Sequence, residues 1–431
     1  MLAGIGEPET MLRSVAVRLF WFALGAPLLV AGAPSPDARA TISPSLVRLA
    51  PGGEQKFKAI MVATRLMGAQ APRETTWSVN NIPGGNAEIG TIDANGAYRA
   101  PAKVPSPREV HICAEVPEAA NRYLRATVIV GNSAPAYKII GRWAEPAGKG
   151  SRLDKPHGIG IDADGNLLIA DQGAGRVLRY TNQGKYLGDI GLGHGSEAGQ
   201  FTDPRFATVD AGGKIYVTDV KGDRPRIQVF DRNGKFIKIF AEKGTGPGQI
   251  LRGHGLAFDR TGRLFVTDVD NMRVSAFAPD GTFLFHWGRD GINPGEFNAP
   301  HGLFMDANDD VVVNGYYGPT QKFTFDGRFL LAFAYGDPPD GSVYFHSLTG
   351  DKWGNVFVTV RTKAGYGGAL ESNVGKKVSM GKYNNNGDFI TTLRLSAMEH
   401  SESWSVVDDD GTVYALFNGR TESGVEIFAE E

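Results

Sequence analysis

From about residue 136 onward, apolar and polar residues follow one pattern that repeats six times. Each unit starts with a short alternating segment, passes an Asp and a Gly-containing turn such as Asp164-Gly165-Asn166, and continues into a β-branched run such as Ile215-Tyr216-Val217-Thr218-Asp219. Two further short alternating segments complete each unit, and four strands per repeat of this length are typical of a β-propeller blade. The Asp residues that mark the repeats are spaced by 48, 49, 47, 45 and 57 residues: Asp162, Asp210, Asp259, Asp306, Asp351 and Asp408. The pattern predicts an all-β fold with a six-bladed β-propeller at residues 134–431.

The two ends of this region predict how the ring closes. The last repeat stops at Val425-Glu426-Ile427-Phe428 and has no fourth strand after it. Residues 137–143, Tyr137-Lys138-Ile139-Ile140-Gly141-Arg142-Trp143, match the fourth strands of other repeats, such as Phe283-Leu284-Phe285-His286-Trp287. We therefore expect strand 137–143 to complete the last blade, which would leave no long open sheet edge.

Residues 41–133 alternate apolar and polar positions between turn clusters, which predicts a β-sandwich. The segments Thr76-Trp77-Ser78-Val79-Asn80 and Gly90-Thr91-Ile92-Asp93-Ala94-Asn95-Gly96 carry a resemblance to the bacterial Ig-like domains of surface and secreted proteins. This resemblance implies an N-terminal Ig-like domain that serves as a spacer or adhesive module.

The first forty residues have the pattern of an export signal. Arg13 and Arg18 precede an apolar stretch at residues 19–32 that is short for a membrane span. Ala38-Arg39-Ala40 is the favoured cleavage site, and Ala31-Gly32-Ala33 is the second candidate. We expect a secreted or periplasmic protein whose mature chain has no membrane span; a retained membrane anchor is the alternative, and Met11 is an alternative start.

Charge and cysteine content narrow the function classes. The chain has 45 basic and 47 acidic residues and a formal net charge of −2, so composition does not favour nucleic acid as a partner. The single cysteine, Cys113, excludes an intramolecular disulfide and is expected to be a small buried residue.

Histidines mark the start of the innermost strand in most repeats. Five of the eight histidines begin these segments, and Arg205 stands there in the second repeat: His157, His254, His301, His346 and His400. Equivalent positions of a propeller converge at one mouth of the central channel, where neutral imidazoles suit Zn²⁺ or another divalent transition metal. The alternative is that these polar side chains only seal the channel mouth.

The repeats resemble NHL repeats, and within that fold they are similar to the lyases that cleave peptidyl-α-hydroxyglycine. Those enzymes hold zinc with three histidines from alternate blades and use a tyrosine on an intervening loop. The resemblance rests on Gly253-His254-Gly255-Leu256, Phe345-His346-Ser347-Leu348 and Asn314-Gly315-Tyr316-Tyr317. It implies zinc ligands at His157, His254 and His346, with Tyr316 as the catalytic base.

Further site residues follow from the same comparison and from the loops. Arg205 is the second candidate catalytic residue, and Lys221 or Arg224 would replace the arginine of the family. Tyr317, Arg361 and the Gly-rich segment 365–377 are expected above the histidines, where they would contact substrate. The chain departs from the family in its additional His301 and His400, in its uncertain arginine and in its circular offset.

Two function classes remain open. The first is a zinc-dependent lyase that acts on a small-molecule or peptide ligand at the channel mouth. The second is a non-catalytic secreted module that binds a ligand or a protein partner. The acidic segments Asp162-Ala163-Asp164-Gly165 and Asp408-Asp409-Asp410-Gly411 also suggest calcium sites. Calcium is less favoured there than a turn, because Asp and Gly recur at these positions for reasons of turn geometry.

Overall fold

The computed structural model describes residues 38–62, 70–146, 152–220, 224–334, 343–362, 378–395, 404–419 and 421–431. The side chains of residues 317, 343–346, 360–362 and 378 are outside this description. All the described residues belong to one compact unit, Pro36–Glu431, and every element within them is a β-strand. In this part of the chain no helix is long and apolar enough to cross a membrane.

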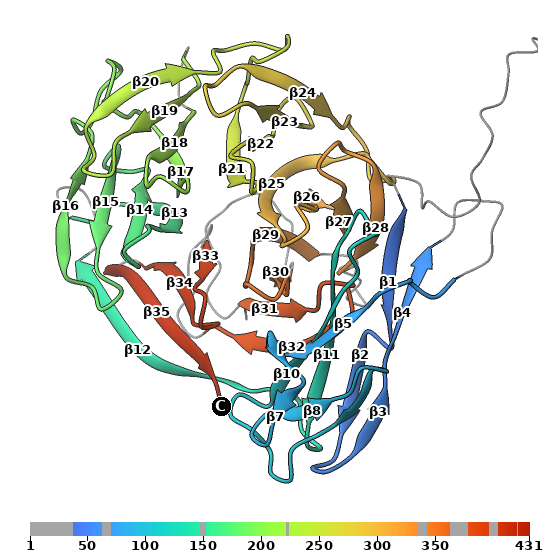
Figure 1. The fold of residues 1–431 in the computed structure, drawn as a ribbon. Helices are drawn as coiled ribbons and strands as arrows, with labels where there is room; N and C mark the ends of the chain where they lie inside the picture. The colour runs from blue at the N-terminus through green and yellow to red at the C-terminus, as the bar shows by residue number, and fades with distance from the viewer. Residues whose placement is uncertain are drawn as a thin grey trace, which may run out of the picture. The chain divides into compact units, whose positions relative to one another are not determined.

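Six four-stranded antiparallel sheets form a ring, which confirms the predicted all-β propeller fold (Figure 1). In the first five blades, the strands follow one another outward in sequence order. Blade 1 contains β13 (Pro156–Ile161), β14 (Leu167–Asp171), β15 (Arg176–Tyr180) and β16 (Tyr186–Ile190); blade 2 contains β17 (Pro204–Val209), β18 (Ile215–Asp219), β19 (Arg226–Phe230) and β20 (Phe236–Phe240). Blade 3 contains β21 (Gly253–Phe258), β22 (Leu264–Asp268), β23 (Arg273–Phe277) and β24 (Phe283–Trp287); blade 4 contains β25 (Asn298–Met305), β26 (Val311–Tyr317), β27 (Thr320–Phe323) and β28 (Phe329–Phe333). Blade 5 contains β29 (Val343–Gly350), β30 (Val356–Thr362), β31 (Val378–Tyr383) and β32 (Phe389–Arg394).

The sixth blade joins the two ends of the propeller. Its strands are β33 (Ser405–Val407), β34 (Val413–Asn418), β35 (Glu422–Glu430) and, as the outermost strand, β12 (Tyr137–Pro146). β12 pairs antiparallel with β35 from Tyr137 opposite Glu430 to Pro146 opposite Glu422. The strand expected at residues 137–143 is thus three residues longer in the structure, and it lies in the predicted place.

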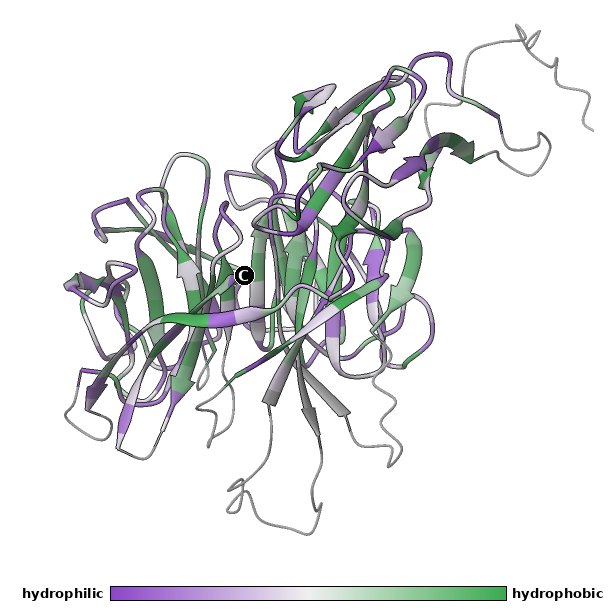
Figure 2. Cartoon of the chain, turned by 90° about the horizontal axis from the view of Figure 1, so that it is seen from below, coloured by the Kyte–Doolittle hydropathy of each residue, from purple (hydrophilic) through white to green (hydrophobic). Residues whose placement is uncertain are grey.

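Apolar side chains pack between neighbouring blades and not only within them. One buried cluster joins Leu168 and Val177 of blade 1 with Ala207 and Val217 of blade 2. Figure 2 shows that apolar residues are concentrated along the strands and polar residues in the connecting turns. The second strand of a blade, which is rich in β-branched residues, is therefore buried on both faces, and this explains its continuous apolar pattern.

The Asp residues that mark the repeats stabilise the turns between first and second strands. Asp162 Oδ1 accepts backbone N–H groups from Asp164 and Asn166, each at 2.9 Å. Asp210 makes the same two bonds to Gly212 and Lys214. The repeated acidic turns therefore satisfy backbone donors, as the turn chemistry predicts.

Three smaller sheets precede the propeller. They are β1 (Arg39–Ser43) with β4 (Lys58–Val62); β2 (Leu46–Leu49), β11 (Tyr123–Val130), β10 (Glu109–Glu115), β5 (Thr76–Val79) and β6 (Ile82–Pro83); and β3 (Glu54–Lys56), β9 (Ala97–Arg99), β8 (Gly90–Ile92) and β7 (Gly85–Asn86). One core, which includes Phe57, Trp77 and Tyr98, is shared by these sheets. The first strand begins at Arg39, two residues before the predicted boundary. The Ig-like assignment and the division of the chain at residues 40 and 133 stay predictions.

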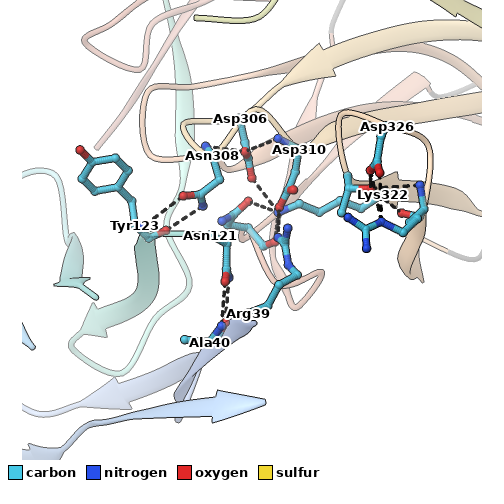
Figure 3. Close-up of polar contacts among 12 residues, drawn as sticks. Arg39, Ala40, Asn121, Tyr123, Asp306, Asn308, Asp310, Lys322 and Asp326 are labelled. Atoms are coloured by element: carbon cyan, nitrogen blue, oxygen red, sulfur yellow. Dashed lines mark hydrogen bonds and ion pairs between the residues drawn. The ribbon is translucent and has the colours of Figure 1, made fainter. Parts of the chain in front are cut away.

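The N-terminal sheets contact the turns of blades 4 and 5. In Figure 3, Arg39 pairs with Asp310, and Asn308 Nδ2 donates to the carbonyl oxygen of Tyr123 at 2.8 Å. In blade 5, Lys382 Nζ lies 2.6 Å from Glu109 Oε2. The innermost strand of blade 4 runs from His301 to the turn at Asp306–Asp310, so these contacts lie at the end of the blade opposite the histidine. These described contacts of the N-terminal sheets thus lie away from the predicted channel mouth.

Candidate functional site at the channel mouth

Three of the predicted histidines lie together where the innermost strands begin. His157 on β13, His254 on β21 and His301 on β25 are 2%, 3% and 5% exposed. The ring centroids of His157 and His254 are 5.2 Å apart, and those of His254 and His301 are 4.5 Å apart. Residues of blades 1, 3 and 4, which are far apart in sequence, therefore form one buried cluster.

A β-bulge places each of these side chains. The pairing of first and second strands shifts register between Pro156 and Gly158, and again between Gly253 and Leu256. Blades 2, 4 and 5 have the same irregularity at Arg205, His301 and His346. A bulge leaves one residue without a ladder partner and re-aims its side chain. The β-bulge that recurs at this position thus accounts for the clustering of side chains from the first strands of different blades.

Hydrogen bonds fix the proton positions on two of the rings. Nδ1 of His157 lies 3.1 Å from the carbonyl oxygen of Arg205, and Nδ1 of His301 lies 2.7 Å from that of Ala299. A carbonyl oxygen only accepts, so Nδ1 carries the proton in each ring. In the neutral form, Nε2 of both rings then holds the lone pair, which is the arrangement seen in metal-binding histidines.

His254 differs from its two neighbours. Its Nδ1 atom is buried and makes no hydrogen bond to any described group. Burial, followed by the nearby His301 and His157, lowers the pKa of His254 well below its usual value. The central ring of the cluster is therefore a neutral imidazole at physiological pH.

Tyr316 and Arg205 flank the histidines. The Tyr316 ring, on β26, lies 4.6 Å from the His301 ring. Arg205 pairs with Asp203 through two contacts, Nε to Oδ1 at 2.9 Å and a second guanidinium nitrogen to Oδ2 at 3.0 Å. A phenol and an oriented guanidinium are thus available beside the imidazoles.

Sequence reasoning missed the aromatic residues that lie against the histidines. The Trp404 ring is 5.9 Å from that of His157, 6.0 Å from that of His254 and 5.2 Å from that of Phe206. Trp404 is 1% exposed and comes from the last blade, so its indole reaches residues of blades 1, 2 and 3. The departure of the sixth repeat from the common His-Gly pattern was the only signal of this residue in the sequence.

The strand register places Trp404 within the sixth repeat. Val407 pairs with Val413 as Ile161 pairs with Leu167, so Trp404 takes the position that Gly158 has in blade 1. His400 lies outside the described residues, so its place among the other histidines stays a prediction.

The remaining predicted residues are only partly placed. His346, Tyr317 and Arg361 lie on described strands, but their side chains are outside the described residues, as are Lys221 and His400 altogether. Arg224 is exposed. Among the residues that the structure describes, no group of three or more His, Cys, Asp or Glu side chains is arranged to hold a metal ion. The described part of the predicted zinc set is the pair His157 and His254.

Comparison with known proteins connects the repeats to named relatives. No family model matches the chain. The chain is 29% identical over 131 residues to NHL repeat-containing protein 3 of Mus musculus, and the aligned region covers 28% of this chain and 38% of that protein. It is 32% identical over 126 residues to the mouse peptidyl-glycine alpha-amidating monooxygenase, which covers 27% of this chain and 13% of that protein. The matches thus span well under half of either relative.

The six-bladed ring is an NHL-type β-propeller. Among solved structures, a streptogramin B lyase aligns over 68% of this chain and 99% of its own, with a TM-score of 0.45 and 12% identity. A gluconolactonase from Xanthomonas campestris aligns over 69% of this chain and 95% of its own, with a TM-score of 0.45 and 13% identity.

Proposed function

We propose that the channel mouth of this NHL-type propeller binds a divalent transition metal such as zinc and acts as a lyase of the peptidyl-α-hydroxyglycine type. The observation that carries the proposal is the pairing of His157 and His254, which come from alternate blades and lie 5.2 Å apart between ring centroids. The similarity to the amidating monooxygenase, although it covers only 13% of that protein, supports the same chemistry.

The donor chemistry of the described residues fits such a metal. Tetrahedral zinc binds imidazole nitrogen at about 2.0–2.1 Å, which places two ligand ring centroids roughly 5 Å apart. His157 and His254 have this separation, and His157 carries its proton on Nδ1. We propose His157, His254 and His346 as the metal ligands, with His301 adjacent. The bound metal would supply a Lewis acid that polarises a substrate oxygen.

The other groups have defined roles in this proposal. Tyr316, beside His301, would exchange a proton with the substrate hydroxyl as general base. Arg205, held by Asp203, would orient a carbonyl or carboxylate group of the substrate. The aromatic rings of buried Trp404 and partly buried Phe206 would exclude water from the inner side of the site. The predicted export signal would place this activity outside the cytoplasm.

Metal content tests the first step. The purified protein should contain one equivalent of transition metal, and the variants His157→Ala, His254→Ala and His346→Ala should lose it. His286→Ala is the matched control, because His286 lies exposed on the outer strand β24. A wild-type protein without stoichiometric metal after zinc reconstitution would contradict the proposal.

Turnover tests the second step. The metal-loaded protein should convert a peptidyl-α-hydroxyglycine to a peptide amide and glyoxylate, and Tyr316→Phe should lower kcat by about 10²-fold or more. Metal binding without turnover would instead assign the propeller to the class of non-catalytic ligand-binding modules.

A further inference from the structure

Buried threonines of the second strands join the histidines of neighbouring blades. Thr267, on β22, is fully buried. The Gly255 N–H donates to Thr267 Oγ1 at 2.8 Å, and Thr267 Oγ1 donates to the carbonyl oxygen of His301 at 2.7 Å. One hydroxyl therefore ties the residue that follows His254 to the backbone of His301 in the next blade.

Thr218 occupies the same position one blade earlier. The Phe206 N–H donates to Thr218 Oγ1 at 3.1 Å, and this hydroxyl lies 3.3 Å from the carbonyl oxygen of His254. Thr218 is also fully buried. The bulge that contains Arg205 is thus connected to His254 in the way that the bulge of His254 is connected to His301.

Glycine at the next position allows the blades to come this close. A Cβ atom on Gly255 would lie 2.6 Å from the carbonyl oxygen of His301, and one on Gly158 would lie 2.1 Å from that of Arg205. Both distances are shorter than carbon–oxygen contact permits. The glycines set how near the strands approach, and the threonine hydroxyls set how they are aligned.

We propose that Thr267 and Thr218 are positioning residues of the channel-mouth site, which fix the separation of the imidazoles by holding the histidine backbone across the gap between blades. The inference rests on the proposed metal site for its functional meaning. Metal ligands must be placed within about 0.2 Å of their preferred distances. Without this hydroxyl, the Gly255 N–H and the His301 carbonyl oxygen lose a buried partner, which is costly for both groups. We expect the backbone to relax there, and with it the ring of the proposed ligand His254, which precedes Gly255.

The test compares variants that differ only in the hydroxyl. Thr267→Val keeps the shape of the side chain and removes the donor, whereas Thr267→Ser restores it. Thr391→Val is the matched control, because Thr391 Oγ1 donates to the carbonyl oxygen of Pro135 at 2.7 Å on the outer strand β32. Titration with Co²⁺, followed by its visible absorption, should show affinity at least tenfold weaker for T267V and near wild type for T267S and T391V. Equal losses in T267V and T391V, or no loss in T267V, would overturn the proposal.

Metal-free crystal structures separate this proposal from the proposed function. If the wild type binds no Co²⁺, the metal site fails, and the separation of the His254 and His301 rings in wild type and T267V still tests the role of Thr267. An unchanged separation rejects that role, and a changed one that T267S reverses supports it. If T267V does not fold, T218V provides the same comparison at His254.

Discussion

Glu109 Oε2 lies 2.6 Å from Lys382 Nζ, and this pair joins strand β10 of the N-terminal sheets to strand β31 of blade 5. Both side chains are buried, and Lys382 also contacts the Tyr137 hydroxyl at 3.0 Å. Burial opposes both charges, but each charge supports the other: the pKa of Glu109 is lowered, and Glu109, Tyr137 and Glu430 hold the pKa of Lys382 well above its usual value. The N-terminal sheets are thus attached to the propeller by a buried ionic contact.

Lys382→Met should strongly destabilise the protein. It leaves Glu109 and Glu430 buried without their cation, and loss of one partner from a buried ion pair costs about 3–5 kcal/mol. Glu422→Ala is the control, because its pair with Arg142 has side chains 45% and 38% exposed and should contribute less than about 1 kcal/mol. Urea unfolding measures both free energies, and similar losses in the two variants would contradict this account of the interface.

Acid should weaken the protein through His111. This residue stacks on Trp353 of blade 5, with ring centroids 4.5 Å apart, and burial lowers its pKa to about 3. As the pH falls below about 6.5, His111 takes up a proton in the unfolded chain but stays neutral in the folded chain. The contribution of neutral His111 to the free energy of unfolding is therefore complete above pH 6.5 and is lost as the pH falls toward 3. His111→Phe keeps an aromatic ring. It should reduce the slope of the unfolding free energy against pH by about 1.4 kcal/mol per pH unit below pH 6. Parallel slopes for wild type and variant, from urea unfolding at pH 7, 6 and 5, would refute this.

The first strand predicts where an export signal is removed. The Ala40 N–H donates to Asn121 Oδ1 at 2.7 Å, Ala40 is 5% exposed, and Arg39 pairs with Asp310 of blade 4. Cleavage after Ala40 would delete these contacts, whereas cleavage at Ala31-Gly32-Ala33 would keep them. We expect the exported protein to retain Arg39, and N-terminal sequencing or intact mass will decide. A mature chain that begins at Thr41 would be the opposite result.

Metal binding should quench the fluorescence of Trp404. Its ring lies 5.9 and 6.0 Å from those of His157 and His254, so Co²⁺ held by these residues would be close enough to quench the indole. Trp404→Phe should remove the quenched fraction and leave the metal stoichiometry unchanged. His254→Ala should abolish quenching with Trp404 still present. Equal quenching in wild type and W404F would show that Co²⁺ binds elsewhere.

The fold was readable because its information is repeated. The Asp in each turn and the β-branched residues of each second strand recur in every repeat, so the blades could be recognised. The strand at residues 137–143 could be placed because the last repeat lacks a fourth strand. An ion pair between the end of the second strand and the start of the third recurs in three blades for the same reason: Asp171 with Arg176, Asp219 with Arg226 and Asp268 with Arg273.

The site was only partly readable because it depends on exceptions to the repeat. His157, His254 and His301 share a register and were found, whereas Trp404 occupies a position that most other blades give to a small residue. Glu109 and Lys382 show no pattern at all, since an ion pair between distant strands leaves no local trace in either of them. Such contacts depend on three-dimensional packing and not on periodicity.

The seam between β12 and β35 decides how the ring responds to mechanical load. Tyr137 pairs with Glu430, so the first and last residues of the propeller lie opposite each other at one end of an antiparallel ladder. A force that separates these two ends would load the ladder one hydrogen bond at a time from that end, as in opening a zipper. The contacts of the N-terminal sheets with blades 4 and 5 would carry part of such a force into the body of the ring.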